Sequence, residues 1–290
     1  MMKKLLFCVV IATILPLIGC KGKENAKPQS FKENPASDFS YTLTDDGKGV
    51  KITKYIGKSE KIIIPATIEG LPVLEVEKLA DKDTEFGESS WNPFTESWVS
   101  PKCNDKITHI VFPDSVRKTG SSFIDNWEPL DLTHFVALEY IKLPAGIEEY
   151  ERPKNKYYDI YYQSHSETLM NEVTGTPLKE TYLPYVEYCD NLKTVIIPEG
   201  PTVIRSFDKN PLLEKVVLPS TVTFISEDAF YGCENLSEIT IPESVSKICF
   251  TYMETNELGK SRSTTRAFEG TSLNLTTQTR LKELGYTGKF

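Results

Sequence analysis

The stretch LEKVVLPSTVTFISEDAFYGCENLSEITIP, residues 213–242, decides the fold because it holds one complete repeat and the start of the next. Each copy opens with a leucine, two polar residues, an apolar residue, any residue, an apolar residue and a proline, Pro219 or Pro242. In an extended chain the apolar positions face one side, and the second and fourth positions before the proline face the other. Proline has no N–H to continue a ladder, so each phrase predicts a short strand that ends there.

The same phrase recurs along most of the chain. Copies read LEYIKLP (138–144) and LKTVIIP (192–198), and variants read ITHIVFP (107–113) and SEKIIIP (59–65). Pro198, Pro219 and Pro242 lie 21 and 23 residues apart, which gives the basic period. The longer spacings before Pro198 predict inserted segments or degenerate coils.

A single unit of this kind cannot bury its apolar face alone. Stacked units can, if each strand pairs in parallel with the next and the AFYGCENL segment (229–236) turns the chain back. The sequence therefore predicts a mainly β repeat solenoid rather than one oversized globular core. About eight coils, at roughly 4.8 Å per strand, would form a strand row on the order of 40 Å long.

The repeat unit resembles the BspA-type leucine-rich repeat of bacterial surface proteins. The resemblance is strongest over 185–275, good over 104–150 and recognisable at 39–80. It implies a parallel strand row, a surface location and a role in adhesion to host matrix proteins or other bacteria.

Both ends of the repeat body carry signs of a cap. Strands at 39–44 and 50–56 around Asp46-Gly47 predict an N-terminal hairpin. Residues 276–284 predict a short C-terminal helix with Leu281 and Leu284 facing inward and Gly285 as its C-cap. The expected organisation is a hairpin cap with the first repeat (39–80), a solenoid (81–275) with insertions at 81–106, 151–178 and 249–266, and a C-terminal cap (276–290).

The N-terminus reads as an export and anchoring signal. Lys3 and Lys4 precede an apolar run too short to span a bilayer comfortably, so residues 1–19 predict a signal peptide. The end of this run, Leu17-Ile18-Gly19-Cys20, resembles a bacterial lipobox, which makes Cys20 the expected lipidation site. Residues 20–38 are polar and predict a flexible tether. We therefore expect an exported lipoprotein held on a membrane, at the outer membrane or cell surface, with a scaffold facing the periplasm as the alternative.

Charge and motif content narrow the function. The chain has 33 Lys and Arg against 41 Asp and Glu, a net charge of −8, which becomes −10 once Lys3 and Lys4 leave with the signal. An acidic chain is a poor non-specific partner for nucleic acid. The sequence has no GxSxG, HExxH, P-loop or GxGxxG motif, so it predicts no enzyme and no cofactor.

Four cysteines remain beyond the expected signal and lipid site. Cys189 and Cys233 each lie nine residues before a repeat proline, and Asn210 fills the same slot in the coil between them. Two coils separate them by roughly 9–10 Å, beyond disulfide reach. They are predicted to be structural ladder residues, with a disulfide to Cys103 or Cys249 as the alternative. No metal site is expected, because Cys and His would have to come from distant insertions.

Two sets of residues are candidates for binding. Outward strand positions form a row with an apolar centre and charged rim, which is either ordinary ladder packing or a recognition surface; Ile63 is also expected to face outward there. The aromatic insertions either bind a protein or a glycan, or pack against the solenoid. The candidates are His109, Val111, Tyr140, Lys142, Ile196 and Val217 on the row, and Trp91, Trp98, Tyr157, Tyr158, Tyr161 and Tyr162 in the insertions.

These features together predict a lipid-anchored, non-enzymatic, adhesin-like protein. Its expected partner is a protein of the host matrix or of another bacterial surface. A periplasmic scaffold and a glycan-binding protein are the alternatives.

Overall fold

The computed structural model describes residues 30–79, 104–123, 126–150, 183–205, 207–226, 228–248 and 266–290, and short strands at 90–92, 97–99, 180–181, 252–255 and 261–264. Residues 32–290 form one compact unit, which is the body described below. The expected signal peptide, Cys20 and the first part of the expected tether lie outside the described residues.

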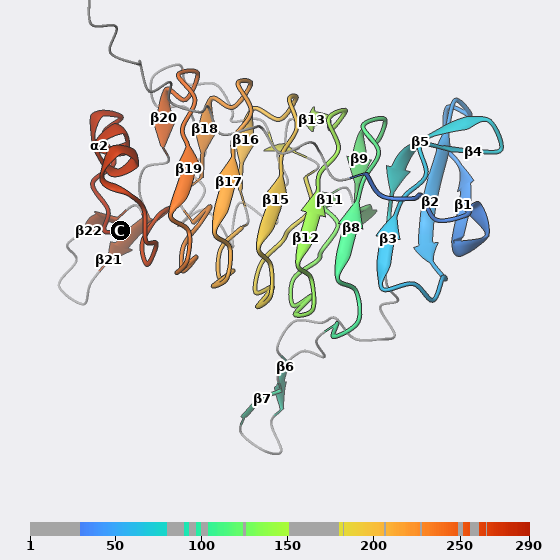
Figure 1. Ribbon diagram of the computed structural model, residues 1–290, viewed down its shortest axis with the longest axis horizontal. Helices are drawn as coiled ribbons and strands as arrows, with labels where there is room; N and C mark the ends of the chain where they lie inside the picture. Colours follow the sequence, from blue (N-terminus) through green and yellow to red (C-terminus); the bar gives the residue numbers. More distant parts are fainter. Residues whose placement is uncertain are drawn as a thin grey trace, which may run out of the picture. The chain divides into compact units, whose positions relative to one another are not determined.

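Six short strands form one parallel sheet in chain order (Figure 1). They are β3 (Lys61–Ile63), β8 (His109–Val111), β12 (Tyr140–Lys142), β15 (Thr194–Ile196), β17 (Lys215–Val217) and β19 (Glu238–Thr240). Each occupies the fourth to second positions before its proline, and its central residue is buried, as the repeat pattern predicts. The mainly β repeat solenoid is confirmed.

The long spacings between prolines are insertions and not degenerate coils. β3 pairs directly with β8, and β12 pairs directly with β15, although the prolines of each pair lie 48 and 54 residues apart. In each case the chain leaves the row and returns at the adjacent coil. The described row therefore has six strands, fewer than the eight or so coils expected.

Small antiparallel pairs accompany these excursions from the row. The strands β6 (Ser90–Asn92) and β7 (Ser97–Val99) pair within the first expected insertion, and β21 (Tyr252–Thr255) and β22 (Ser261–Thr264) pair within the last. The pair β13 (Glu149–Tyr150) and β14 (Glu180–Thr181) flanks the segment 151–178. A further pair, β10 (Ser121–Phe123) and β11 (Asn126–Glu128), was not expected from the sequence.

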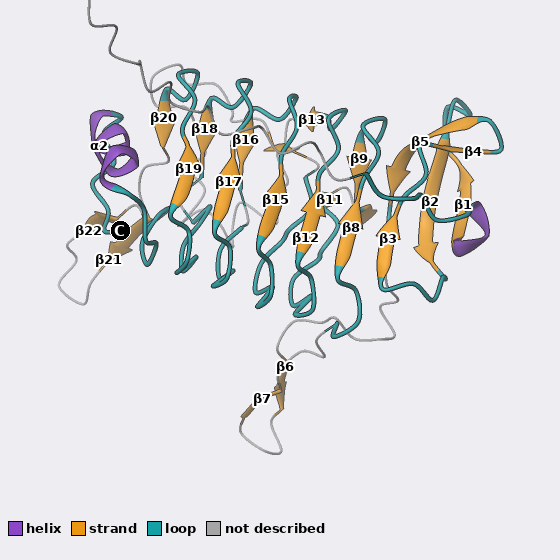
Figure 2. Ribbon diagram, in the orientation of Figure 1, coloured by secondary structure: helices purple, strands orange, loops and turns teal. Residues whose placement is uncertain are grey.

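A second, shorter parallel sheet lies after the prolines. It contains β16 (Val203–Ile204), β18 (Phe224–Ile225) and β20 (Lys247–Ile248), as Figure 2 shows. The apolar pair that follows each proline, such as Val222 and Ile225, is fully buried here. Each coil thus contributes one strand before its proline and another after it, and both help to enclose the core.

The AFYGC-type turns supply the aromatic part of the core. The rings of Phe207 and Phe230 stack with centroids 5.9 Å apart, and Phe230 and Phe268 stack at 5.6 Å. The edge of this stack meets Tyr286 at 5.6 Å, with the two rings nearly perpendicular. A continuous phenylalanine stack therefore links three coils to the C-terminal cap.

The N-terminal cap is the predicted hairpin. β1 (Phe39–Leu43) and β2 (Val50–Tyr55) pair antiparallel, and Gly47 takes the left-handed conformation (φ +66°) that their turn requires. β2 also pairs in parallel with β5 (Leu71–Val76). In turn, β5 pairs antiparallel with β4 (Thr67–Ile68) and in parallel with β9 (Lys118–Thr119).

The edge strand β3 is covered by residues that the sequence assigned to the tether. The Asn34 N–H donates to the Ile63 carbonyl at 2.9 Å, and the Ile63 N–H donates to Asn34 Oδ1 at 2.6 Å. A short 3-10 turn, η1 (Ala36–Asp38), then leads into β1. The expectation that Ile63 is exposed on the outward face is wrong: it is 5% exposed, because this segment satisfies and shields an otherwise open sheet edge.

The C-terminal cap is the predicted helix, α2 (Leu275–Glu283). Asn274 caps its start by accepting from the Thr277 N–H, and its end closes through Gly285 (φ +89°) and a Tyr286 N–H bond to the Leu281 carbonyl. Leu281 is fully buried and Leu284 packs against the core, as predicted. Among the described residues, no helix combines the length and apolar character needed to cross a membrane.

Candidate binding surface

The outward face of the six-stranded sheet brings all six strand-row candidates together. In each strand the middle residue points into the core, so the residues on either side of it share the opposite face. Parallel pairing in register aligns these residues from coil to coil. We call this outward face of the sheet the strand face. It has an aromatic region on β8 and β12 and an aliphatic region on β15 and β17.

The aromatic region is formed by His109 on β8 and Tyr140 on β12. Their rings stack with centroids 5.7 Å apart and an interplanar angle of 25°, and both side chains are half-buried. Burial lowers the pKa of His109, the nearby Lys61 charge lowers it further, and Glu139 offsets part of the shift. The imidazole is therefore neutral at pH 7. Burial also raises the pKa of Tyr140, so its hydroxyl keeps its proton.

Lys142 lies next to this stack and is already engaged within the protein. Its ammonium donates to a carboxylate oxygen of Asp114 and, at 3.4 Å, to the Phe112 carbonyl. Its side chain is 28% exposed, whereas that of Asp114 is 65% exposed. Lys142 thus serves mainly to join two coils, and its neighbour in register, Val111, is half-buried.

The aliphatic region is the exposed part of the strand face. Ile196 on β15 and Val217 on β17 are direct neighbours in register and are 37% and 51% exposed. Beside them, Lys215 and Glu238 form an ion pair at 3.2 Å that is open to solvent and contributes little to stability. Two adjacent aliphatic side chains with a charged border are an arrangement found at protein interfaces.

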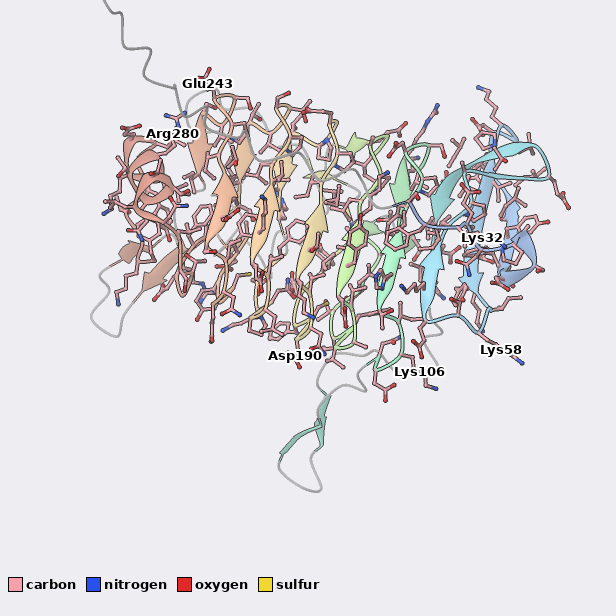
Figure 3. The ribbon with its side chains drawn as sticks, in the orientation of Figure 1. Lys32, Lys58, Lys106, Asp190, Glu243 and Arg280 are labelled. Carbon is pink, nitrogen blue, oxygen red and sulfur yellow. The ribbon has the colours of Figure 1, made fainter. Side chains whose placement is uncertain are left out.

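Two of the insertion candidates, both tryptophans, are among the described residues. Trp91 and Trp98 lie opposite each other in the β6–β7 pair. Tyr157, Tyr158, Tyr161 and Tyr162 lie outside the described residues, as does Cys20. Figure 3 places Asp190 at the edge formed by the AFYGC-type turns and Glu243 at the opposite edge, which follows the prolines.

The repeat cysteines are structural, as predicted. Cys189 and Cys233 are free thiols with no exposed surface, and the Cys233 thiol donates to the Phe207 carbonyl at 3.0 Å. Asn210 lies in the slot between them, where its amide accepts from the Cys189 N–H. Burial raises the pKa of Cys233 to about 12 and raises that of Cys189 still more. Neither thiol is activated as a nucleophile.

The other possible cysteine and metal chemistry is limited. Cys103 and Cys249 lie outside the described residues. In the part of the chain that the structure describes, no group of three His, Cys, Asp or Glu side chains is placed to hold a metal ion.

These buried thiols predict an alkaline loss of stability. The folded protein holds the Cys233 proton more tightly than the unfolded chain, whose thiols titrate near about 8.5. The thiol's contribution is therefore complete below about pH 8.5 and falls as the pH rises toward 12, by about 2 kcal/mol at about pH 10. Denaturant unfolding at both pH values measures this loss. Cys233→Ala should show a smaller loss than the parent chain, and an equal loss would contradict the assignment.

One feature of the turn edge was missed by the sequence reasoning. Gly232 is the glycine of the AFYGC turn. The equivalent residues in the three preceding coils are His134, Tyr188 and Lys209, and all four adopt a left-handed backbone conformation. The sequence does contain a sign of this feature, because Gly232 and Gly270 occupy a repeat position at which the earlier coils carry larger residues.

Comparisons with known proteins give the following matches. The model of the BspA type leucine rich repeat region matches residues 205–274, with six copies. A leucine rich repeat protein of T. pallidum is 22% identical with a TM-score of 0.43, covering 89% of this chain and 99% of its own. A leucine rich cell surface protein of Faecalibacterium prausnitzii is 18% identical with a TM-score of 0.41, covering 84% of this chain and 48% of its own. No curated protein matches the chain.

Proposed function

Residues 205–274 carry BspA-type leucine-rich repeats, and from that premise we propose a lipid-anchored, non-enzymatic protein that binds a protein partner on its strand face. The observation that carries this proposal is the exposed Ile196–Val217 pair, which shares the outward face of the six-stranded sheet with the His109–Tyr140 stack. Repeat proteins of this kind use extended faces for binding. The partner is a host matrix protein or a protein on another bacterial surface, which makes the role adhesin-like.

The energetic basis is the removal of apolar surface from water. A partner that covers Ile196 and Val217 desolvates two aliphatic side chains that the fold leaves open. The stacked rings of His109 and Tyr140 extend this area at low cost in side-chain entropy, because their mutual packing already restricts them. The lipobox at Leu17-Ile18-Gly19-Cys20 supports a membrane anchor at the other end of the chain.

We expect that placing charge on the aliphatic region weakens partner binding strongly. Val217→Lys and Ile196→Lys should each weaken binding about 30-fold, as loss of a hot-spot residue does, because a buried unpaired ammonium opposes docking. The intact protein, purified in detergent, is titrated against immobilised matrix proteins and against whole bacterial cells.

The matched control is Leu275→Lys, which adds the same charge at an exposed leucine on α2. It should leave binding unchanged. If no matrix protein or bacterial surface binds the folded parent chain saturably, or if Val217→Lys binds as well as Leu275→Lys, the proposal fails.

A further inference from the structure

The turn edge of the solenoid repeats one backbone conformation in five coils. The left-handed residues are His134, Tyr188, Lys209, Gly232 and Gly270, with φ between 54° and 80°. Their N–H groups support the stack: that of Lys209 donates to the Tyr231 carbonyl at 2.6 Å, and that of Gly232 donates to the Glu269 carbonyl at 2.8 Å. The coil-to-coil bonds thus fix this conformation, whichever residue occupies the position.

A side chain at this position strains the backbone. Glycine adopts a left-handed conformation freely, whereas a bulky residue such as Tyr188 meets a clash at its Cβ. The repeat has glycine available, as Gly232 and Gly270 show. Among the described residues, Glu69 is the one other non-glycine residue with positive φ, so this strain is concentrated on the turn edge. Strained positions of this kind are characteristic of functional sites.

The strained side chains form a platform. The rings of His134 and Tyr188 stack with centroids 5.0 Å apart and an interplanar angle of 30°, and Tyr188 is 41% exposed. In the following coils, Lys209 Nζ lies 4.2 Å from the centroid of Tyr231, and Arg266 Cζ lies 4.6 Å from the same centroid. An open aromatic pair is therefore followed by an aromatic ring that two cationic side chains contact.

Gly232 makes room for this arrangement. A Cβ at that position would lie 3.0 Å from Lys209 Cδ and 3.4 Å from its Nζ, so a side chain would force the lysine to shift by a few tenths of an ångström. Glycine at 232 and side chains at 134, 188 and 209 are thus complementary parts of one surface, which we call the turn-edge strip.

The charges on the turn-edge strip are unsuited to an anion. Arg266 Nε is paired with Asp228 Oδ1 at 2.7 Å, and the Lys209 charge interacts with the adjacent Asp208 carboxylate, so both cations have an acidic neighbour. Asp190 and Glu234 are exposed in the same turns and add negative charge. The strip also differs from a protein-binding core, because its exposed large apolar side chains are tyrosines, Tyr185 and Tyr188, with no aliphatic residue among those described.

We propose that the turn-edge strip binds a neutral oligosaccharide, at a site separate from the strand face. The C–H face of a sugar ring stacks on the exposed Tyr188 ring, and carboxylates such as Asp190 accept hydrogen bonds from its hydroxyl groups. A chain of sugar rings suits an elongated surface whose backbone conformation recurs from coil to coil. This site uses none of the residues of the proposed protein-binding surface.

The test replaces the platform and keeps the backbone. Asn tolerates the left-handed conformation, so Tyr188→Asn and His134→Asn remove the rings without forcing the turn to change. The intact protein in detergent is screened against neutral oligosaccharides, sulfated oligosaccharides and peptides. We expect saturable binding to a neutral oligosaccharide and a loss of at least about ten-fold in each variant, with no fall in melting temperature.

Two controls separate binding from folding. Glu69→Asn changes the other strained position, away from the strip, and Val217→Lys changes the strand face; neither should alter oligosaccharide binding. The proposal is overturned if no neutral oligosaccharide binds, if only sulfated oligosaccharides or peptides bind, or if Tyr188→Asn retains the parent affinity.

Discussion

Phe230→Ala is expected to lower the free energy of unfolding by about 3–5 kcal/mol, the range measured for buried aromatic residues cut to alanine. Phe230 has no exposed surface and lies in the middle of the phenylalanine stack, between Phe207 and Phe268. Its removal leaves a cavity that the coils on either side cannot close, because their positions are fixed by backbone bonds between coils. The loss therefore affects both neighbouring interfaces.

Denaturant unfolding followed by circular dichroism measures this effect. Phe230→Leu is the matched control, since it keeps most of the apolar volume and loses the ring contacts, and it should cost clearly less. Leu132 and Val186 already occupy the equivalent core position in earlier coils. A loss below about 1 kcal/mol for Phe230→Ala would show that the stack is not a main source of stability.

The repeat strands could be predicted because their signal is local. Alternation before a proline specifies both the strand and the side that faces the core, and all six strands of the row follow it. The helix α2 was found in the same way, from Leu281, Leu284 and Gly285. Tyr286 was not found, although it closes the phenylalanine stack and accepts from the Phe268 N–H, because that contact joins residues with no shared period.

The two wrong expectations, for Ile63 and for the expected tether, also concern contacts that the repeat period does not describe. Ile63 follows the outward pattern of its strand, yet it is buried by Asn34, which comes from a polar segment that looked like a tether. The repeat period predicts which side chains of a strand face the core. It does not predict which segment covers the edge strand at the end of the row. Composition likewise could not show that residues 33–38 belong to the folded body.

The candidate binding surface was predictable in position and less so in character. The strand face was located correctly from the repeat, but only the structure shows that Lys142 is engaged by Asp114 and that Ile196 and Val217 are the open pair. The left-handed backbone conformation of the turn residues was the property that the sequence predicted least. His134 and Tyr188 are ordinary residues in the sequence, and their left-handed geometry follows from the hydrogen bonds between coils.

Asn210→Ala is expected to destabilise the protein by about 3 kcal/mol, despite the small change in volume. The Asn210 side chain is fully buried, accepts from the Cys189 N–H at 2.9 Å, and donates to the carbonyls of Val186 at 2.8 Å and Phe207 at 2.9 Å. The Phe207 carbonyl keeps the Cys233 thiol as a donor. The Cys189 N–H and the Val186 carbonyl lose their Asn210 bonds in a site away from water, at a cost of roughly 1–3 kcal/mol each.

The repeat itself supplies the matched control, Asn210→Cys, studied under reducing conditions. In this slot the Cys233 thiol donates to the Phe207 carbonyl, and the Cys189 thiol donates to the Leu132 carbonyl at 3.4 Å. A thiol at 210 should likewise reach the Val186 carbonyl but cannot replace the acceptor for the Cys189 N–H. We expect about half of the loss seen with alanine, measured by denaturant unfolding. If alanine and cysteine cost the same, the bond to Val186 contributes nothing, and the cost comes from the lost acceptor of the Cys189 N–H, which both variants lack.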